Sequence, residues 1–288
     1  MVRYKGSITD TVFELCHTRK VKRISFDDRH ISLATFTRLK KSCRNKIKLV
    51  SADGIVEKLR EIKSKDEVSQ IRKALKLNLE AYSFLRGVVK PGISEKEVLR
   101  RLESYVKGRG AGFSFDPIIA SGPNSCYPHA RVSDRKIRNN ELVLVDMGID
   151  IGGYKSDLTR VFFLGKIASQ IREVCDIVST AQKKAIQKIR ANVLAHEVDF
   201  QARNHIAKKG LGKLFGHSLG HGVGLEIHEC PTVSQKSPSL LKEGMVFTVE
   251  PAVYIPNKFG IRIEDMVLVT QEGCEVLSRN SKTDQICP

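Results

Sequence analysis

The sequence predicts an α+β fold with an antiparallel sheet and two related halves, preceded by a short α/β segment. The first observation is that the chain after residue 64 runs helix, helix, strand, strand and then repeats that order. The second is that residues 1–64 alternate short strands with short helices and hold few large apolar side chains for a core of their own. We therefore expect an N-terminal α/β segment, 1–64, and a larger domain, 65–288.

The N-terminal segment is expected to contain two strands and two helices. Strand composition marks residues 21–26 and 46–50, and helices fit residues 32–41 and 54–62. Because the segment has so little apolar material, we expect it to be part of something larger or a cover docked on the larger domain.

The larger domain opens with a long amphipathic helix over residues 66–89. Apolar residues recur there at three- and four-residue steps, which marks one buried helix face: Val68, Ile71, Leu75, Leu79, Tyr82 and Leu85. Ser94 and Glu97 have the spacing of a capping box, which predicts a second helix to about residue 107. A matching pair of helices is expected at 168–190 and 197–209.

Strands come after each pair of helices. Apolar and β-branched runs predict them in the first half at 117–120, 142–146 and 157–163. The same kind of run predicts them in the second half at 246–251, 252–255 and 261–269. No repeat is detectable in the residues themselves, so the two halves are related by pattern alone.

The net charge of +17 raises the question of a nucleic-acid partner. The excess is concentrated near the N-terminus, because residues 1–64 contain 16 basic and 7 acidic residues. The basic residues stand in short clusters, such as Arg19 to Arg23, without regularly interleaved aromatic residues. We therefore expect a solvated basic surface, which argues against a nucleic-acid partner.

The sequence shows neither a membrane span nor a secretion signal. No apolar run approaches the ~20 residues that a bilayer requires, and no apolar stretch comes after the first charges. The seven cysteines are scattered and lack a Cys-x-x-Cys pair, which excludes a disulfide scaffold and a zinc ribbon. We expect a cytoplasmic protein with reduced thiols.

Two aspartates stand at the ends of neighbouring apolar strands. Asp146 ends one strand, Asp157 begins the next, and Gly152-Gly153 between them is turn material. If the hairpin closes just before these glycines, the two carboxylates lie directly opposite each other. Like charges in that position destabilise a sheet, so the pair persists most easily when cations neutralise it. Two solvent-facing aspartates beside a turn would fit the same residues.

A second acidic pair has the same arrangement. Glu250 and Glu264 stand in apolar strands, and the midpoint between them is Asn257, inside a turn-like stretch. Glutamates are rarely buried unless they are paired or bind a metal. Two hairpins of one kind favour a metal site over two chance pairs.

Histidines supply the rest of the candidate site. His217 and His221 lie in a glycine-dense stretch, where backbone can pack close to whatever the imidazoles touch, and His228 comes shortly afterwards. Four carboxylates and one histidine suit two hard divalent ions such as Mn²⁺ better than a lone structural Zn²⁺. The His-Glu-x-x-His motif of zincins does not occur.

Separated blocks between residues 65 and 280 resemble the pita-bread metallopeptidases. This group contains the methionine aminopeptidases and the proline-specific Xaa-Pro aminopeptidases and dipeptidases (prolidases). The matching blocks are Ser121-Gly122-Pro123-Asn124-Ser125 with Pro128-His129-Ala130, Leu144-Val145-Asp146-Met147-Gly148, Ser156-Asp157-Leu158-Thr159-Arg160, His217 to Gly224, Thr248-Val249-Glu250-Pro251 and Arg262-Ile263-Glu264-Asp265.

The resemblance implies a pita-bread (creatinase/aminopeptidase) fold and two divalent metal ions per chain. Mn²⁺ is the first choice, and Co²⁺, Zn²⁺ and Fe²⁺ share the same ligands. The positions that match the family's metal ligands are Asp146, Asp157, His221, Glu250 and Glu264. Asp157 and Glu264 would bridge both ions. The matching catalytic and substrate-contact positions are His129, His217 and His228, and Glu250 is the candidate for relaying the proton.

Arg262 favours the proline-specific branch of this group. A basic residue two before the last glutamate, with His217 four before the ligand histidine, resembles enzymes that cleave between an N-terminal residue and proline. We therefore assign Arg262 to substrate binding, and a simple salt bridge to Glu264 or Asp265 is the alternative. Other functions considered are a methionine aminopeptidase-like exopeptidase and a non-catalytic basic binding protein. The choice between dipeptidase and aminopeptidase stays open.

The N-terminal part departs from the resemblance. Proline-specific relatives usually carry a longer α/β domain before the catalytic part, and residues 1–64 look like the last part of it. In that family this domain builds the dimer and helps to close the site over the substrate. We therefore expect a homodimer weakened by the short segment, and a less certain selectivity for peptide length.

Overall fold

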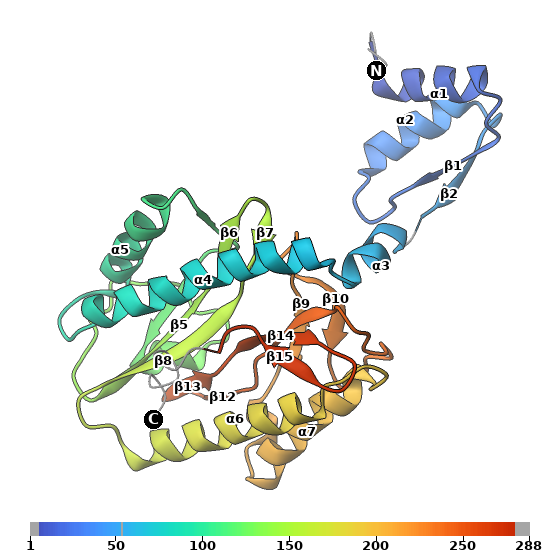
Figure 1. Cartoon of the computed structure of the whole chain (residues 1–288). Helices are drawn as coiled ribbons and strands as arrows, with labels where there is room; N and C mark the ends of the chain where they lie inside the picture. The colour runs from blue at the N-terminus through green and yellow to red at the C-terminus, as the bar shows by residue number, and fades with distance from the viewer. Residues whose placement is uncertain (1–5, 53, 280–288) are drawn as a thin grey trace. The chain divides into compact units, whose positions relative to one another are not determined.

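The computed structural model describes residues 6–52 and 54–279. The chain divides into two units, Met1–Leu59 and Arg60–Pro288, whose elements are labelled in Figure 1. The boundary expected from the sequence, after residue 64, lies slightly further along the chain and stays a prediction.

The first unit is a small α/β segment. Strands β1 (Arg23–Phe26) and β2 (Lys48–Ser51) pair in parallel, and α2 (Leu33–Cys43) connects them. Helix α3 (Ile55–Glu61) comes after β2. Helix α1 (Ile8–Thr18) was not predicted from the sequence, and its Val12, Phe13 and Cys16 pack in the small core of this unit.

In the second unit, a pair of helices followed by a series of strands occurs twice. The first succession consists of α4 (Lys65–Val88), α5 (Glu95–Lys107), β3 (Gly112–Phe113), β4 (Ile118–Ser121), η1 (Gly122–Cys126), β5 (Glu141–Met147), β6 (Ile149–Ile151), β7 (Tyr154–Lys155) and β8 (Leu158–Leu164). The second consists of α6 (Ser169–Lys188), α7 (Ala195–Lys208), η2 (Gly212–Leu214), β9 (Gly220–Gly222), β10 (Glu229–Val233), β11 (Val246–Val249), β12 (Ala252–Ile255), β13 (Phe259–Arg262), β14 (Asp265–Val269) and β15 (Cys274–Val276).

The strands of the second unit pair in antiparallel fashion. The sheets have the orders β4-β5-β8, β3-β6-β7, β12-β13 and β10-β9-β11-β14-β15, and each ladder between these neighbours is antiparallel. The expected α+β fold with an antiparallel sheet is therefore confirmed.

The two halves also match in their backbone connections. In the turn between α4 and α5, the Gly92 N–H donates to Ile137 O at 2.8 Å. In the turn between α6 and α7, the Asn192 N–H donates to Leu241 O at 2.9 Å. Both turn residues have positive φ, 91° for Gly92 and 65° for Asn192. The prediction of two related halves is confirmed by this correspondence.

Helix capping differs from the expectation at one place. Ser94 accepts a hydrogen bond from the Glu97 N–H, but the Glu97 carboxylate turns to Arg100 and Arg101 instead of back to the helix start. The capping box is found one helix earlier, where Ser64 and Glu67 satisfy each other's backbone N–H at the start of α4. Two arginines within one turn compete for the Glu97 carboxylate. The Ser-x-x-Glu spacing therefore predicted a capping box that does not form.

Each pair of helices builds its own core against the strands. Helices α4 and α5 bury Tyr82 and Leu102 in a cluster with residues of β5 and β8, and α6 and α7 bury Val178 and Ile206 with Phe247 of β11. Burying one such side chain contributes ~1.5–3 kcal/mol. In Figure 1, α4 and α6 run along opposite sides of the strands, so the strand ends that carry the candidate residues lie between two helical layers.

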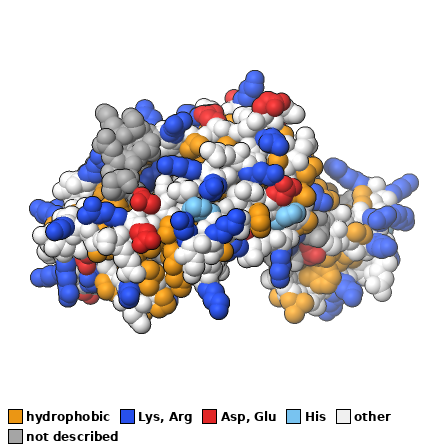
Figure 2. Space-filling model, turned by 90° about the horizontal axis from the view of Figure 1, so that it is seen from below, with side chains coloured by type: hydrophobic (Ala, Val, Ile, Leu, Met, Phe, Trp, Pro, Cys, Tyr) orange, Lys and Arg blue, Asp and Glu red, His pale blue; other side chains and the backbone are white. Residues whose placement is uncertain are grey.

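Three chain-wide expectations can be compared with the structure. On the face drawn in Figure 2, Lys and Arg side chains are scattered with Asp and Glu among them, as a solvated basic surface requires. None of the helices in the described ranges is long and apolar enough to cross a membrane.

Cys175 in α6 is disulfide-bonded, so the expectation of reduced thiols is wrong at this position.

Candidate metal centre

The first acidic pair lies on the β5–β8 hairpin. Asp146 is in β5 and Asp157 directly precedes β8, but Asp146 faces Thr159 across the ladder rather than Asp157. The predicted register was therefore wrong by two residues. The cause is the turn, because Gly152 and Gly153 have φ values of 61° and 86° and close the hairpin themselves. A shift of two keeps a side chain on the same face, and both aspartates line one cavity.

The second acidic pair stands at the break between two ladders. Strand β11 pairs with β14 up to Val249, and β12 pairs with β13 from Ala252 onward. Glu250 and Glu264 occupy the intervening positions in the same register, and the turn centres on Asn257, whose φ is 60°. Their predicted juxtaposition is confirmed. The expected single strand 261–269 is two strands, because the ladder is interrupted at this pair.

In each half, a buried helix side chain forms hydrogen bonds with both strands of the acidic hairpin, next to the candidate ligands. The Tyr82 hydroxyl of α4 lies 2.9 Å and 2.6 Å from two carbonyl oxygens of β5 and β8. The Gln182 amide of α6 donates at 3.0 Å and 3.2 Å to two carbonyl oxygens of the second acidic segment. Each carbonyl belongs to a sequence neighbour of a candidate ligand: Val145 and Leu158 for Tyr82, Val249 and Ile263 for Gln182.

His221 reaches the acidic pairs from β9. Its backbone N–H donates to Thr248 Oγ1 at 3.1 Å, and that hydroxyl donates to Glu250 Oε1 at 3.1 Å. The glycines beside His221 make this approach possible. A Cβ on Gly220 would collide with the Thr248 carbonyl, and one on Gly222 with a carbonyl of β10. The glycine-dense stretch therefore brings β9 close to its neighbours on both sides.

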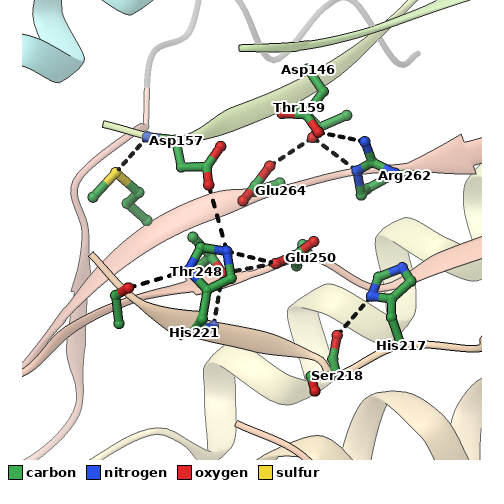
Figure 3. Close-up of polar contacts among 12 residues, drawn as sticks. Asp146, Asp157, Thr159, His217, Ser218, His221, Thr248, Glu250, Arg262 and Glu264 are labelled. Atoms are coloured by element: carbon green, nitrogen blue, oxygen red, sulfur yellow. Dashed lines mark hydrogen bonds and ion pairs between the residues drawn. The ribbon is translucent and has the colours of Figure 1, made fainter. Parts of the chain in front are cut away.

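Candidate ligand atoms converge from both halves, as Figure 3 shows. Ligand atoms of Asp157, His221 and Glu264 all lie within 4.8 Å of one another. His221 Nε2 is 3.5 Å from Asp157 Oδ2 and 3.3 Å from Glu250 Oε1. Burial is the largest single influence on both groups and disfavours their charged forms. The hydrogen bond and charge attraction between His221 and Glu250, with other nearby charges, together raise the pKa of His221 and lower that of Glu250.

Asp146 is held by Arg262 rather than by the other ligands. Arg262 Nη2 lies 2.5 Å from Asp146 Oδ2, and Arg262 Nε donates to Thr159 Oγ1 at 3.1 Å. The alternative of a salt bridge from Arg262 to Glu264 or Asp265 was wrong in its partner, since Asp265 pairs with Arg160 at 2.8 Å. The buried guanidinium instead offsets part of the negative charge of the acidic cluster.

The electrostatics of the cluster fit divalent cations. Burial raises the pKa of Asp146, and burial with repulsion from neighbouring carboxylates raises the pKa of Asp157 and Glu264 well above their ordinary values. Within the described part of the chain, Asp146 Oδ1 and Asp157 Oδ1 are buried without a hydrogen-bond partner. Buried carboxylate oxygens of this kind need a proton or a cation. Four carboxylates and one imidazole make a donor set that divalent ions accept.

All predicted site residues line one cavity of about 660 Å³. Besides the five candidate ligands, these are His129, His217, His228 and Arg262. The His228 ring stands edge-on to His221 with the ring centroids 4.3 Å apart. Burial lowers the pKa of His217 and His228, which favours their neutral forms near pH 7.

Sequence reasoning missed two polar residues of the cavity region. Thr159 donates to Glu264 Oε2 at 2.6 Å. The Tyr254 hydroxyl lies 3.2 Å from His217 Nε2 and also accepts from Arg262, and burial raises the pKa of Tyr254 to about 12. Thr159 stands two residues after Asp157, so the two-residue period of a strand could have placed both on one face.

Comparison with known proteins identifies both parts of the chain. Residues 69–271 match the model of metallopeptidase family M24, and residues 1–62 match that of the creatinase/prolidase N-terminal domain. An Xaa-Pro dipeptidase of Pyrococcus horikoshii is 42% identical over 231 residues, which cover 80% of this chain and 66% of that protein.

Two solved structures share the fold over nearly the whole chain. An Xaa-Pro dipeptidase of Bacillus anthracis has a TM-score of 0.94 at 36% identity, covering 97% of this chain and 78% of that one. An X-Pro aminopeptidase of Thermotoga maritima has a TM-score of 0.90 at 35% identity, covering 96% and 79%. The pita-bread fold expected from the resemblance is thereby confirmed, and the chain belongs to metallopeptidase family M24, whose members use divalent metals to cleave peptides.

Proposed function

We propose that this metallopeptidase binds two divalent ions and hydrolyses the bond between an N-terminal residue and a following proline. The observation that carries the proposal is the convergence of four carboxylates and one imidazole, with two buried carboxylate oxygens left without a partner. Asp146, Asp157, His221, Glu250 and Glu264 would hold the ions. Mn²⁺ is the proposed metal, because most of these ligands are hard carboxylate oxygens.

The chain's own residues are proposed to position the substrate and move the proton. When bound, divalent ions would supply a reactive water near neutral pH and neutralise charge on the scissile carbonyl. Glu250 is proposed to accept and relay the proton, since its lowered pKa keeps it ionised. His228, beside His221 at the cavity wall, is proposed to donate to the developing oxyanion. Losing one such donor costs ~10²–10³ in rate.

His129, His217 and Arg262 are proposed to orient the peptide. His217 Nδ1 lies 2.8 Å from Ser218 O, which leaves Nε2 on the cavity side near Tyr254. Arg262 stands in the cavity wall. Four of its five N–H groups donate to other residues: Asp146, Thr159, Pro128 and Tyr254. We therefore propose that Arg262 offers the substrate a single hydrogen bond rather than a bidentate clamp.

The proposed specificity is supported by the relatives and by the chemistry of proline. The three relatives described above are named as enzymes that act on Xaa-Pro bonds. Proline has no backbone N–H and a fixed φ, so its peptide bond calls for a dedicated pocket. We also propose that residues 65–288 form the catalytic domain.

The test is hydrolysis of Ala-Pro, Ala-Pro-Ala and Met-Ala-Ser side by side, with and without added Mn²⁺. Metal-dependent cleavage of either proline peptide is expected, and the dipeptide alone would identify a dipeptidase. Glu250→Ala should abolish the reaction, whereas Glu243→Gln, at an exposed glutamate before β11, should not. Release of methionine from Met-Ala-Ser without cleavage of a proline peptide would overturn the proposed specificity.

A further inference from the structure

Glu95, the first residue of α5, is a buried carboxylate outside the metal centre. The residue is completely buried, with 0% of its surface exposed to solvent. Ionised carboxylates are almost never buried unless several donors satisfy them. The Ser121–Ser125 block, which carries part of the family resemblance, takes no part in the chemistry proposed above. The contacts of Glu95 give that block a role.

Each oxygen of the Glu95 carboxylate serves a different end of one loop. Oε1 accepts from the Ser121 N–H and from Ser121 Oγ, both at 2.7 Å. Oε2 accepts from the Ser133 N–H at 3.0 Å and from Ser133 Oγ at 2.7 Å. The Asn124 amide lies between them, 3.2 Å from Oε1 and 3.1 Å from Oε2. The Glu95 carboxylate thus links the two ends of the loop formed by residues 121–133.

The closed loop carries His129 into the cavity. His129 is exposed to solvent and lines the cavity, so its place depends on the loop backbone more than on side-chain packing. Its neighbour Pro128 accepts a hydrogen bond from Arg262 Nη1 at 3.2 Å. The far end of the loop is fixed to α5 by the Lys96 N–H, which donates to Ser133 O at 3.1 Å. The near end is held at Ser121 by the β4–β5 ladder, in which Ser121 faces Val143, and by Arg135 Nη1, which donates to Ser121 Oγ. The Glu95 side chain is the group that joins this end directly to the far end.

We propose that Glu95 is a positioning residue that closes the 121–133 loop and sets the place of His129. The inference rests on the proposed role of His129 in holding substrate. A displacement of about 1 Å at such a group costs ~10²-fold in rate, so the link matters although Glu95 touches no substrate.

The decisive variant is Glu95→Gln. An amide has one oxygen and one NH₂, and each end of the loop presents a backbone N–H that cannot rotate away. Whichever way the amide turns, its NH₂ faces either the Ser121 N–H or the Ser133 N–H, so one end of the loop loses its hydrogen bonds to residue 95. We expect kcat/KM for the proline peptide to fall by ~10- to 100-fold. Glu97→Gln, on the same helix but paired with Arg100 and Arg101 at the surface, should leave it unchanged.

A double-mutant cycle with His129→Ala separates positioning from a general loss of structure. If Glu95 acts through His129, Glu95→Gln should change kcat/KM less than ~2-fold once His129 is alanine. A full, multiplicative loss in that background would overturn the proposal. Should Glu95→Gln fail to fold, Ser133→Ala removes one donor and keeps the N–H, and the same cycle is expected with a smaller first step.

A readout without substrate keeps this inference distinct from the proposed function. Amide hydrogen exchange should be slow at Ser121 and Ser133 in the parent protein and faster at one of them in Glu95→Gln. The nuclear magnetic resonance signals of the His129 ring should shift in the same variant. If the parent cleaves no proline peptide but these changes occur, the proposed function fails and the positioning role stands. Unchanged exchange and an unchanged His129 signal would overturn the positioning role.

Discussion

Each half of the second unit holds a loop that carries a cavity histidine, and the two halves use different side chains to do so. In the first half, Glu95 at the start of α5 accepts hydrogen bonds from both ends of the loop that carries His129. In the second half, Ala195 stands at the corresponding helix start, where its N–H donates to Ser239 O as the Glu95 N–H donates to Arg135 O. A shared backbone frame therefore does not require shared side chains.

In the second half, a hydrogen-bond donor on the helix holds the loop that carries His217. Arg203 of α7 donates to Phe215 O at 2.9 Å and to His217 O at 2.8 Å. Its charge is balanced by the fully buried Asp199, which lies 2.8 Å from both Arg203 Nε and Nη2. One half thus uses an acceptor and the other a donor to place a cavity histidine. This exchange is one place where the halves match in backbone but differ in sequence.

The largest predicted effect comes from removing one candidate ligand from each half. Asp157→Asn and Glu264→Gln should each lower kcat about 10³-fold, because the metal stabilises the transition state by several kcal/mol. Asp150→Asn, on β6 of the same hairpin but outside the cavity lining, serves as the control. Steady-state kinetics at saturating Mn²⁺ measure the effect. A variant that keeps a tenth of the parent rate would show that its half is dispensable for the metal site.

The next effect is on stability and belongs to the second half alone. Arg203→Met leaves the buried Asp199 without its partner, which is expected to cost ~3–5 kcal/mol of unfolding free energy. Urea unfolding measures it, with Lys208→Met at an exposed position of the same helix as the control. Adding Asp199→Leu to Arg203→Met should restore part of the loss. If Arg203→Met unfolds like the parent, the Asp199–Arg203 pair does not anchor the loop.

Helix starts offer a smaller contrast with opposite signs in the two halves. Helix α4 begins with the capping box of Ser64, whereas α6 begins at the exposed Ala168 without a side-chain cap. Ser64→Ala should lower the free energy of unfolding by ~1 kcal/mol, and Ala168→Ser should raise it by ~0.5–1 kcal/mol. Thermal unfolding of both variants checks the signs. Equal signs would mean that capping does not distinguish the halves.

The smallest effect is a pH dependence confined to the first half. Hydrogen bonding to the Ser64 N–H lowers the pKa of Glu67 in the folded chain. Such a carboxyl stabilises the fold above its unfolded pKa, about 4.3, and loses that contribution as the pH falls through its folded value. The free energy of unfolding of the parent should therefore exceed that of Glu67→Gln by a few tenths of a kcal/mol at pH 7. Denaturant titrations should show this difference disappearing toward pH 2; a constant difference would contradict the assignment.

The candidate ligands that the structure brings together are residues whose chemistry is rare in a core. Paired acids in apolar strands and a histidine among glycines are costly without a ligand, so Asp146, Asp157, Glu250 and Glu264 stand out with His221 in the sequence alone. All five line the same cavity. The helices of the second unit were predicted because one face of each is buried, which produces a regular apolar period.

The features that the sequence could not show depend on competition between neighbours. The register of the first hairpin was set by which glycines close the turn, a difference of two residues that composition does not encode. Glu97 had the spacing of a capping box but was drawn to two arginines. The partner of Arg262 is Asp146, more than a hundred residues away in the chain, and no local pattern links them.

The most direct test of the account is the number of metal ions that the chain binds. Equilibrium dialysis against Mn²⁺, followed by elemental analysis, should give two ions per chain for the parent protein. Glu264→Gln, which removes one of the five proposed ligands, should bind less than one ion under the same conditions. One ion per chain in the parent, or two ions retained by Glu264→Gln, would contradict a dinuclear centre built from both halves.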